Sequence, residues 1–176
     1  MPSGREILWL DDDARGFTSI AAMWEISRGA KVTIVDNIES AIAALREKDF
    51  DWFITDGFLA PSGGFAKESD ERGAGFTALE FGIAFACYVR AYFDELPITI
   101  FTAAIMMPRL ESLEKSHGIH VVQKTAYFSL EDAVDMLDAI FRVSRRDESR
   151  SGRNDLRTEF GSRASIAEFW DSYDVG

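Results

Sequence analysis

The sequence predicts an α/β protein built on a parallel sheet with helices on both faces. Short apolar runs alternate with longer stretches of helical spacing, five times in succession. The runs are continuously apolar, which is typical of strands that are buried on both faces of a parallel sheet. Five such strand-then-helix units indicate an open, doubly wound sheet, in which ligands bind beyond the carboxyl ends of the strands.

The individual elements follow from the same pattern. The predicted strands are the β-branched and apolar runs at residues 7–10, 32–35, 52–55, 98–102 and 119–122. The predicted helices lie at residues 14–28, 38–48, 75–94, 108–116 and 130–144. Their ends have suitable residues, because Gly29 follows the first helix while Asn37 and Ser129 precede two others as N-caps.

Two segments interrupt this rhythm. Residues 57–74 are polar and rich in turn-forming residues, so we expect a long loop there. We divide the chain into a domain at residues 1–144 and, at residues 145–176, a charged linker with a short amphipathic tail. The apolar residues of the tail share one helical face: Ile166, Phe169, Trp170 and Tyr173. Such a tail could dock on its own domain, pair with a second copy or bind another protein.

Composition excludes several classes of protein. The 176 residues include 47% hydrophobic residues, enough for a real core, so a disordered chain is excluded. With 19 Lys and Arg against 30 Asp and Glu, the net charge is −11, which disfavours nucleic acids and anionic membranes as partners.

Cysteine usage and hydropathy point to the cytoplasm. One cysteine, Cys87, cannot form a disulfide within the chain, and its apolar surroundings predict a buried structural thiol. Neither a signal peptide nor an apolar run long enough to span a membrane is expected.

Polar side chains follow four of the five predicted strands. They are Asp11, Asp12 and Asp13 after the first strand, Asp56 after the third, Thr102 at the end of the fourth and Lys124 after the fifth. Because these strand ends meet at one edge of the sheet, we expect the side chains to converge there. Carboxylates hold Mg²⁺ and an ammonium neutralises phosphoryl oxygens, so the pattern indicates phosphoryl transfer to a carboxylate.

In this order and at these strand ends, the residues resemble the receiver domain of two-component response regulators. The resemblance covers residues 5–144 and rests on the pair Asp11-Asp12, the lone Asp56, Thr102 followed by Ala103, and Lys124 followed by Thr125. It implies a flavodoxin-like fold with strand order 2-1-3-4-5 and helices on both faces.

The resemblance also implies a role for each matching residue. Asp56 would be the phospho-acceptor, with Thr102 and Lys124 contacting the phosphoryl group. The Mg²⁺ ligands would be Asp11, Asp12, Asp56 and the backbone carbonyl of Phe58, with Asp13 as a bystander. The phosphoryl donor would be a sensor histidine kinase or a histidine phosphotransfer protein.

The implied output is a change in protein–protein contacts. The protein would be a regulator and not an enzyme, acting on an unknown downstream partner, and a homodimer is possible. A helix-turn-helix output domain would need more folded sequence than the tail offers.

Three features depart from the receiver pattern. Gly75 is expected to begin the helix after Asp56 and lies 19 positions beyond that residue. In receivers this glycine usually lies closer to the aspartate. The aromatic residue that receivers place three positions before the lysine is Val121 here. Phe58 and Ala104, at positions that help to orient the hydrolytic water in this family, are apolar, so we predict slow loss of phosphate.

Two alternatives use the same sequence differently. A pseudo-receiver would keep Lys124 as an ion-pair partner without chemistry and would act as a binding module through its tail. A phosphatase of the haloacid-dehalogenase type would use Asp11 as nucleophile and Asp13 as general acid, with Thr102 and Lys124. That family expects a small turn where this chain has Ala14-Arg15, and Asp56 would be unexplained.

Overall fold

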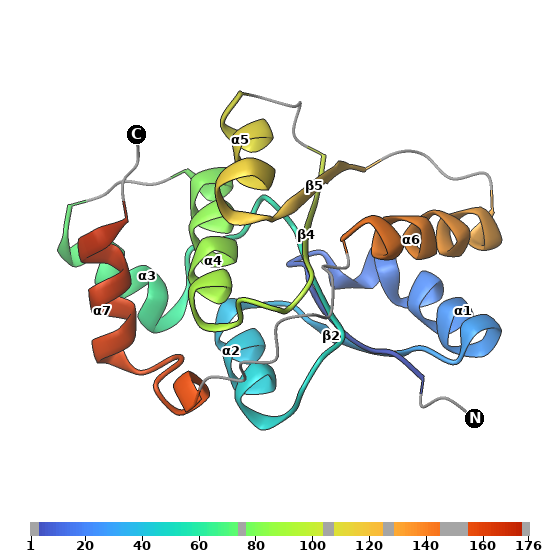
Figure 1. Ribbon diagram of the computed structural model, residues 1–176, viewed down its shortest axis with the longest axis horizontal. Helices are drawn as coiled ribbons and strands as arrows, with labels where there is room; N and C mark the ends of the chain where they lie inside the picture. Colours follow the sequence, from blue (N-terminus) through green and yellow to red (C-terminus); the bar gives the residue numbers. More distant parts are fainter. Residues whose placement is uncertain (1–3, 74–76, 104–107, 125–128, 145–154, 174–176) are drawn as a thin grey trace.

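A five-stranded parallel sheet forms the centre of the computed structural model, which describes residues 4–73, 77–103, 108–124, 129–144 and 155–173 (Figure 1). The strand order is β2-β1-β3-β4-β5, as the resemblance implied. The strands are β1 (Glu6–Leu10), β2 (Lys31–Val35), β3 (Trp52–Thr55), β4 (Ile98–Thr102) and β5 (His120–Gln123). All five predicted strands are therefore confirmed, and every neighbouring pair is parallel.

Helices cover both faces of the sheet (Figure 1). One face is covered by α1 (Thr18–Arg28), which the short 3₁₀ helix η1 (Ala14–Phe17) precedes, and by α6 (Leu130–Ser144). The other face is covered by α2 (Ile38–Glu47), α4 (Ala78–Tyr92) and α5 (Pro108–His117). The predicted end signals function as expected, because Gly29 adopts φ 66° and the Asn37 side chain accepts a hydrogen bond from the Ser40 N–H.

The expected loop at residues 57–74 is wrong in its central part, where the structure has helix α3 (Gly63–Glu71). Its first residues are fixed by Glu39 of α2, whose carboxylate accepts a 2.6 Å hydrogen bond from the Gly64 N–H. One large side chain anchors the helix, because Phe65 is fully buried against the rings of Phe81 and Tyr88. The segment is polar elsewhere, so its sequence shows no amphipathic helical pattern.

The tail docks on its own domain, which is one of the three placements that the sequence left open. It contains the 3₁₀ helix η2 (Asp155–Thr158) and helix α7 (Arg163–Ser172), which lies against α3 (Figure 1). Phe160, Ile166 and Trp170 are buried in the same core as α2 and α4. The Trp170 indole N–H also donates a 3.0 Å hydrogen bond to the Phe65 carbonyl oxygen. Residues 145–154 lie outside the described residues, and the domain boundary at residue 144 stays a prediction.

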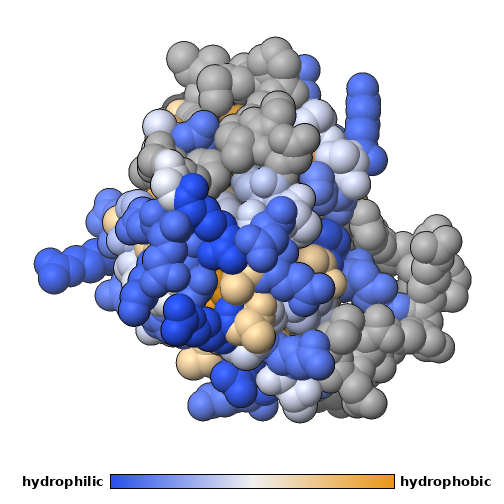
Figure 2. Space-filling model, turned by 90° about the vertical axis from the view of Figure 1, so that its left-hand side faces the viewer, coloured by the Kyte–Doolittle hydropathy of each residue, from blue (hydrophilic) through white to orange (hydrophobic). Residues whose placement is uncertain are grey.

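Ion pairs also stabilise the contact between α3 and α7. Glu68 is only 5% exposed as a residue, and its carboxylate accepts hydrogen bonds from Arg163 (2.7 Å) and Arg72 (3.1 Å). Arg72 donates in turn to the Asp171 carboxylate (2.8 Å) and the Ala167 carbonyl oxygen (3.0 Å). The described surface of this side is mostly hydrophilic, with a few apolar residues near its centre (Figure 2). The apolar face of α7 packs inward, because Ile166 and Trp170 are buried.

Two smaller expectations are also tested by the structure. Cys87 is buried in α4, as predicted. Among the described residues, no helix combines the length and the apolar character that a membrane-spanning segment needs.

Candidate functional site

Three of the site residues, Asp11, Asp56 and Lys124, stand one position beyond their strands, and backbone hydrogen bonds to neighbouring strands hold them. Backbone N–H groups there continue the pattern of the sheet: Asp11 N–H to Val35 O (3.0 Å), Asp56 N–H to Leu10 O (2.9 Å) and Lys124 N–H to Thr102 O (2.7 Å). The backbone at these three positions therefore continues the hydrogen bonding of the sheet, and the side chains lie at the carboxyl ends of the strands.

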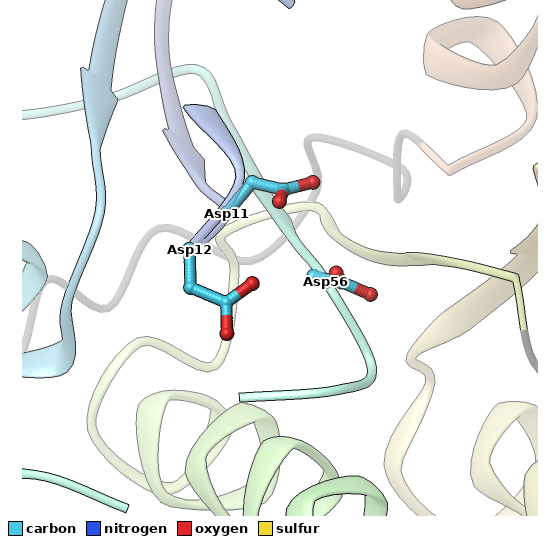
Figure 3. A group of neighbouring side chains, drawn as sticks. All are labelled: Asp11, Asp12 and Asp56. Atoms are coloured by element: carbon cyan, nitrogen blue, oxygen red, sulfur yellow. The ribbon is translucent and has the colours of Figure 1, made fainter. Parts of the chain in front are cut away.

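Three carboxylates meet at this edge (Figure 3). Asp11, Asp12 and Asp56 each offer an oxygen, and these three oxygens all lie within 4.8 Å of one another. Asp11 and Asp56 are buried, while Asp12 is exposed. Asp13 does not belong to this group, but its backbone N–H donates a 2.9 Å hydrogen bond to the Asp11 carboxylate. The grouping thus contains three of the acids expected for a metal site and does not include Asp13.

Lys124 bridges two of the acids. Its Nζ lies 3.0 Å from Oδ2 of Asp11 and 3.2 Å from Oδ2 of Asp56. The other oxygen of Asp56, Oδ1, accepts a 3.1 Å hydrogen bond from the Phe58 N–H. The structure therefore brings the predicted acceptor and the predicted ammonium into direct contact.

The environment of Asp56 raises the pKa of its carboxyl group. Burial raises the pKa of the Asp56 carboxyl above its ordinary value, and the negative charge of Asp11 adds to the rise. The Phe58 N–H and the positive charge of Lys124 oppose this rise in the pKa. The net direction is upward, so a cation at the cluster would favour the charged, nucleophilic form of Asp56.

Thr102 is fully buried and packs on Gly57, the residue that follows Asp56. A Cβ atom added to Gly57 would lie 2.7 Å from the Thr102 Oγ1 atom, so only glycine fits between them without movement. Thr102 is thus adjacent to the Asp56 loop, as the sequence predicted. Ala103 is described and exposed, whereas Ala104 and Thr125 lie outside the described residues.

The structure also adds neighbours that sequence reasoning missed. The Nζ atom of Lys124 lies over two aromatic rings, 5.0 Å from the ring centre of Phe17 and 5.8 Å from that of Phe101. The spacing of these residues along the sequence does not predict either contact. Both contacts depend on how η1, β4 and the end of β5 approach one another in the fold.

Val121 stands where receivers have an aromatic residue, and the structure shows its surroundings. Val121 pairs in register with Ile100 and is partly buried against the core on the face of the sheet that α2, α4 and α5 cover. Its neighbour His120 pairs in register with Thr99, which belongs to the other face of the sheet. An aliphatic residue therefore occupies the position where receivers have an aromatic one.

Comparisons with solved structures identify the fold. A Francisella response regulator receiver domain is similar over 81% of this chain and 100% of its own, with a TM-score of 0.56 and 15% identity. A Thermotoga maritima response regulator is similar over 79% of this chain and 98% of its own, with a TM-score of 0.55 and 15% identity. A CheY-like receiver domain protein from Methanospirillum hungatei is similar over 81% and 97%, with a TM-score of 0.56 and 15% identity.

Sequence comparisons give no relative. No protein-family model matches the chain, and no curated protein matches it significantly. The likeness is one of fold: this chain has the fold of a response-regulator receiver domain, and about a fifth of it lies outside the match. A shared fold does not by itself define what the site does.

Proposed function

We propose that this protein is a single-domain response regulator in which Asp56 accepts a phosphoryl group. The observation that supports this most is the placement of Lys124, whose Nζ is ion-paired with both Asp11 and Asp56 beside the third acid, Asp12. A carboxylate nucleophile, an ammonium and two further acids at one sheet edge are what an acyl-phosphate site needs.

In the proposed reaction, a carboxylate oxygen of Asp56 forms a bond to phosphorus while the phosphorus–nitrogen bond of a phosphohistidine breaks. The electron pair of the broken bond stays on the imidazole. The Phe58 N–H holds Oδ1 of Asp56, and Lys124 lies beside Oδ2, so a phosphoryl group on Oδ2 would meet the ammonium directly. The donor is a sensor histidine kinase or a histidine phosphotransfer protein.

The charge of the cluster fits a divalent cation. Three carboxylates and one ammonium leave two negative charges, which would repel an incoming phosphoryl group. Oxygen ligands of this kind suit Mg²⁺, and Asp11, Asp12, Asp56 and the Phe58 backbone carbonyl would hold it. When bound, the ion would supply charge neutralisation for the phosphoryl oxygens.

Such a regulator would act in the cytoplasm by changing contacts with a downstream protein. The phosphoryl group would add charge and strong hydrogen-bond acceptors at the edge where Thr102 and Lys124 lie, and α5, the helix that follows β4, would repack in response. The acidic net charge of −11 fits a protein partner better than a nucleic acid. A homodimer would be one such contact.

The test is the intact mass of the protein after incubation with acetyl phosphate and Mg²⁺. The wild type should gain one phosphoryl group, the Asp56→Ala variant should gain none, and a chelator should abolish the gain. Asp13→Asn is the matched control, because it removes a neighbouring acid outside the cluster and should leave the adduct intact.

Two other results would overturn the proposal in different directions. If no adduct formed and a beryllofluoride complex also failed to bind, the pseudo-receiver alternative would stand. If phosphate were released from the donor by wild type and Asp56→Ala but not by Asp11→Ala, the phosphatase alternative would stand.

A further inference from the structure

The ammonium of Lys124 has a second set of neighbours besides the carboxylates. It lies over the faces of Phe17 and Phe101, at distances at which a cation is attracted to an aromatic ring. A lysine side chain is flexible, with three rotatable donors on a four-carbon stem. Two acids alone would attract the ammonium without fixing the path of this stem.

The two rings are themselves fixed by a third. Trp9 is fully buried, and its ring centre lies 4.7 Å from that of Phe17 and 6.1 Å from that of Phe101. Phe17 and Phe101 contact each other edge to face, with their ring centres 6.3 Å apart. Trp9 is itself held in the central strand β1, where it pairs in register with Ile34 and Ile54.

Phe17 and Phe101 differ in their position. Phe101 lies in β4 and is 1% exposed, so it belongs to the core. Phe17 is half-buried and ends η1, the short helix that begins directly after Asp13. The same turn that follows the acids therefore also presents a ring to the ammonium.

We infer that Phe17 is a positioning residue, whose ring holds the Lys124 ammonium where it meets a phosphoryl group on Asp56. This inference rests on the proposed function. The ring acts through Lys124 and touches neither donor nor acceptor: it limits the directions open to the lysine stem and shields one side of the ammonium from water. The incoming negative charge then finds the cation already in place, which lowers the cost of reorganisation.

Substitutions at residue 17 distinguish the effect of the aromatic ring from the effect of side-chain size. Phe17→Leu keeps an apolar side chain and removes the π face, whereas Phe17→Tyr keeps both. Phe17→Met replaces Phe17→Leu if the latter is unstable. The matched control is Phe50→Leu, because the Nζ of Lys48 lies 4.7 Å from the Phe50 ring centre in a similar pair elsewhere on the molecule.

The measurement is the rate of adduct formation with acetyl phosphate and Mg²⁺, followed by intact mass. Phe17→Leu should lower this rate about three- to tenfold, and Phe17→Tyr and Phe50→Leu should react like wild type. The decisive variant is the double one, Phe17→Leu with Lys124→Met. If Phe17 acts through Lys124, the double variant should be no slower than Lys124→Met alone.

Each other outcome has one meaning. A Phe17→Leu protein as fast as wild type, an equal loss in Phe17→Tyr, or a further loss in the double variant overturns the inference and leaves the proposed function intact. A wild type that forms no adduct overturns the proposed function and the inference with it.

Discussion

Gly82 of α4 packs directly on the backbone of Gly57, the residue after the proposed acceptor. A Cβ atom added to Gly82 would lie 2.1 Å from the Gly57 carbonyl oxygen and 3.2 Å from that of Asp56. On its other side, Gly57 leaves no room for a side chain beside Thr102. The helix, the acceptor loop and the buried threonine therefore form one tightly packed contact.

Gly82→Ala should consequently harm both stability and phosphorylation. Alanine is normally better than glycine inside a helix by about 1 kcal/mol, but here the added methyl group must displace the backbone that carries Asp56. We expect a net loss of about 1–3 kcal/mol in the free energy of unfolding, measured in urea, and slower adduct formation. Gly16→Ala is the control, because a Cβ atom there meets nothing within 4 Å. A Gly82→Ala protein more stable than wild type would refute this account of the contact.

Trp170 should be a major source of stability although it lies close to the end of the chain. It is 6% exposed, contacts the rings of Phe65 and Phe81 and donates a hydrogen bond to the Phe65 carbonyl oxygen. Trp170→Ala should lower the free energy of unfolding by about 3–5 kcal/mol in urea denaturation. Ile26→Ala, at a position 84% exposed on α1, should change it by less than about 0.5 kcal/mol. Equal effects of the two changes would mean that α7 does not contribute to the core in solution.

The ion pairs between α3 and α7 should make stability depend on pH. The hydrogen bond from Arg163, together with that from Arg72, lowers the pKa of Glu68 below its ordinary value of 4.5, against the opposing effect of burial. Because the pKa is lower in the folded state, this stabilisation is present above the ordinary value and is lost as the pH falls through the folded-state pKa.

The measurement compares wild type with Glu68→Gln in urea at several pH values. The difference in the free energy of unfolding should be largest near neutral pH and should shrink as the solution is acidified through and below pH 4.5. A difference that is constant over this range would show that Glu68 contributes by packing alone.

The phosphorylated protein should lose its phosphoryl group slowly. Phe58, two residues beyond Asp56, is 40% exposed and has no polar group with which to orient a hydrolytic water. Once the phosphoryl donor is removed, the adduct should persist for longer than seconds, and Phe58→Asn should shorten its half-life roughly tenfold or more, as measured by intact mass. Phe58→Leu should behave like wild type. A wild-type half-life of seconds would contradict this prediction.

The strands and the residues at their ends follow from local sequence patterns, whereas helix α3 depends on contacts with distant segments. The five strands were predictable because continuous apolar runs are typical of a doubly covered sheet, and the convergence of Asp11, Asp56 and Lys124 follows from parallel strands ending at one edge. Helix α3 was missed because a single large residue, Phe65, anchors it to partners distant in sequence, including α7.

The finer design of the site depends on tertiary contacts. The approach of Phe17 to Lys124 joins residues that are 107 positions apart, and the contact of Gly82 with Gly57 requires α4 to lie against the acceptor loop. Neither contact can be predicted from a periodicity or a spacing in the sequence. Strand order came from the resemblance to receivers, and the pattern of runs alone does not specify it.

The most direct test of the account is the position of the phosphoryl group. After incubation with acetyl phosphate and Mg²⁺, reduction with borohydride converts an aspartyl phosphate to homoserine, which peptide mass mapping locates. We expect homoserine at position 56 and at no other aspartate, with none in protein treated without Mg²⁺. Homoserine at position 11, or an unmodified position 56 in protein that has gained a phosphoryl group, would contradict it.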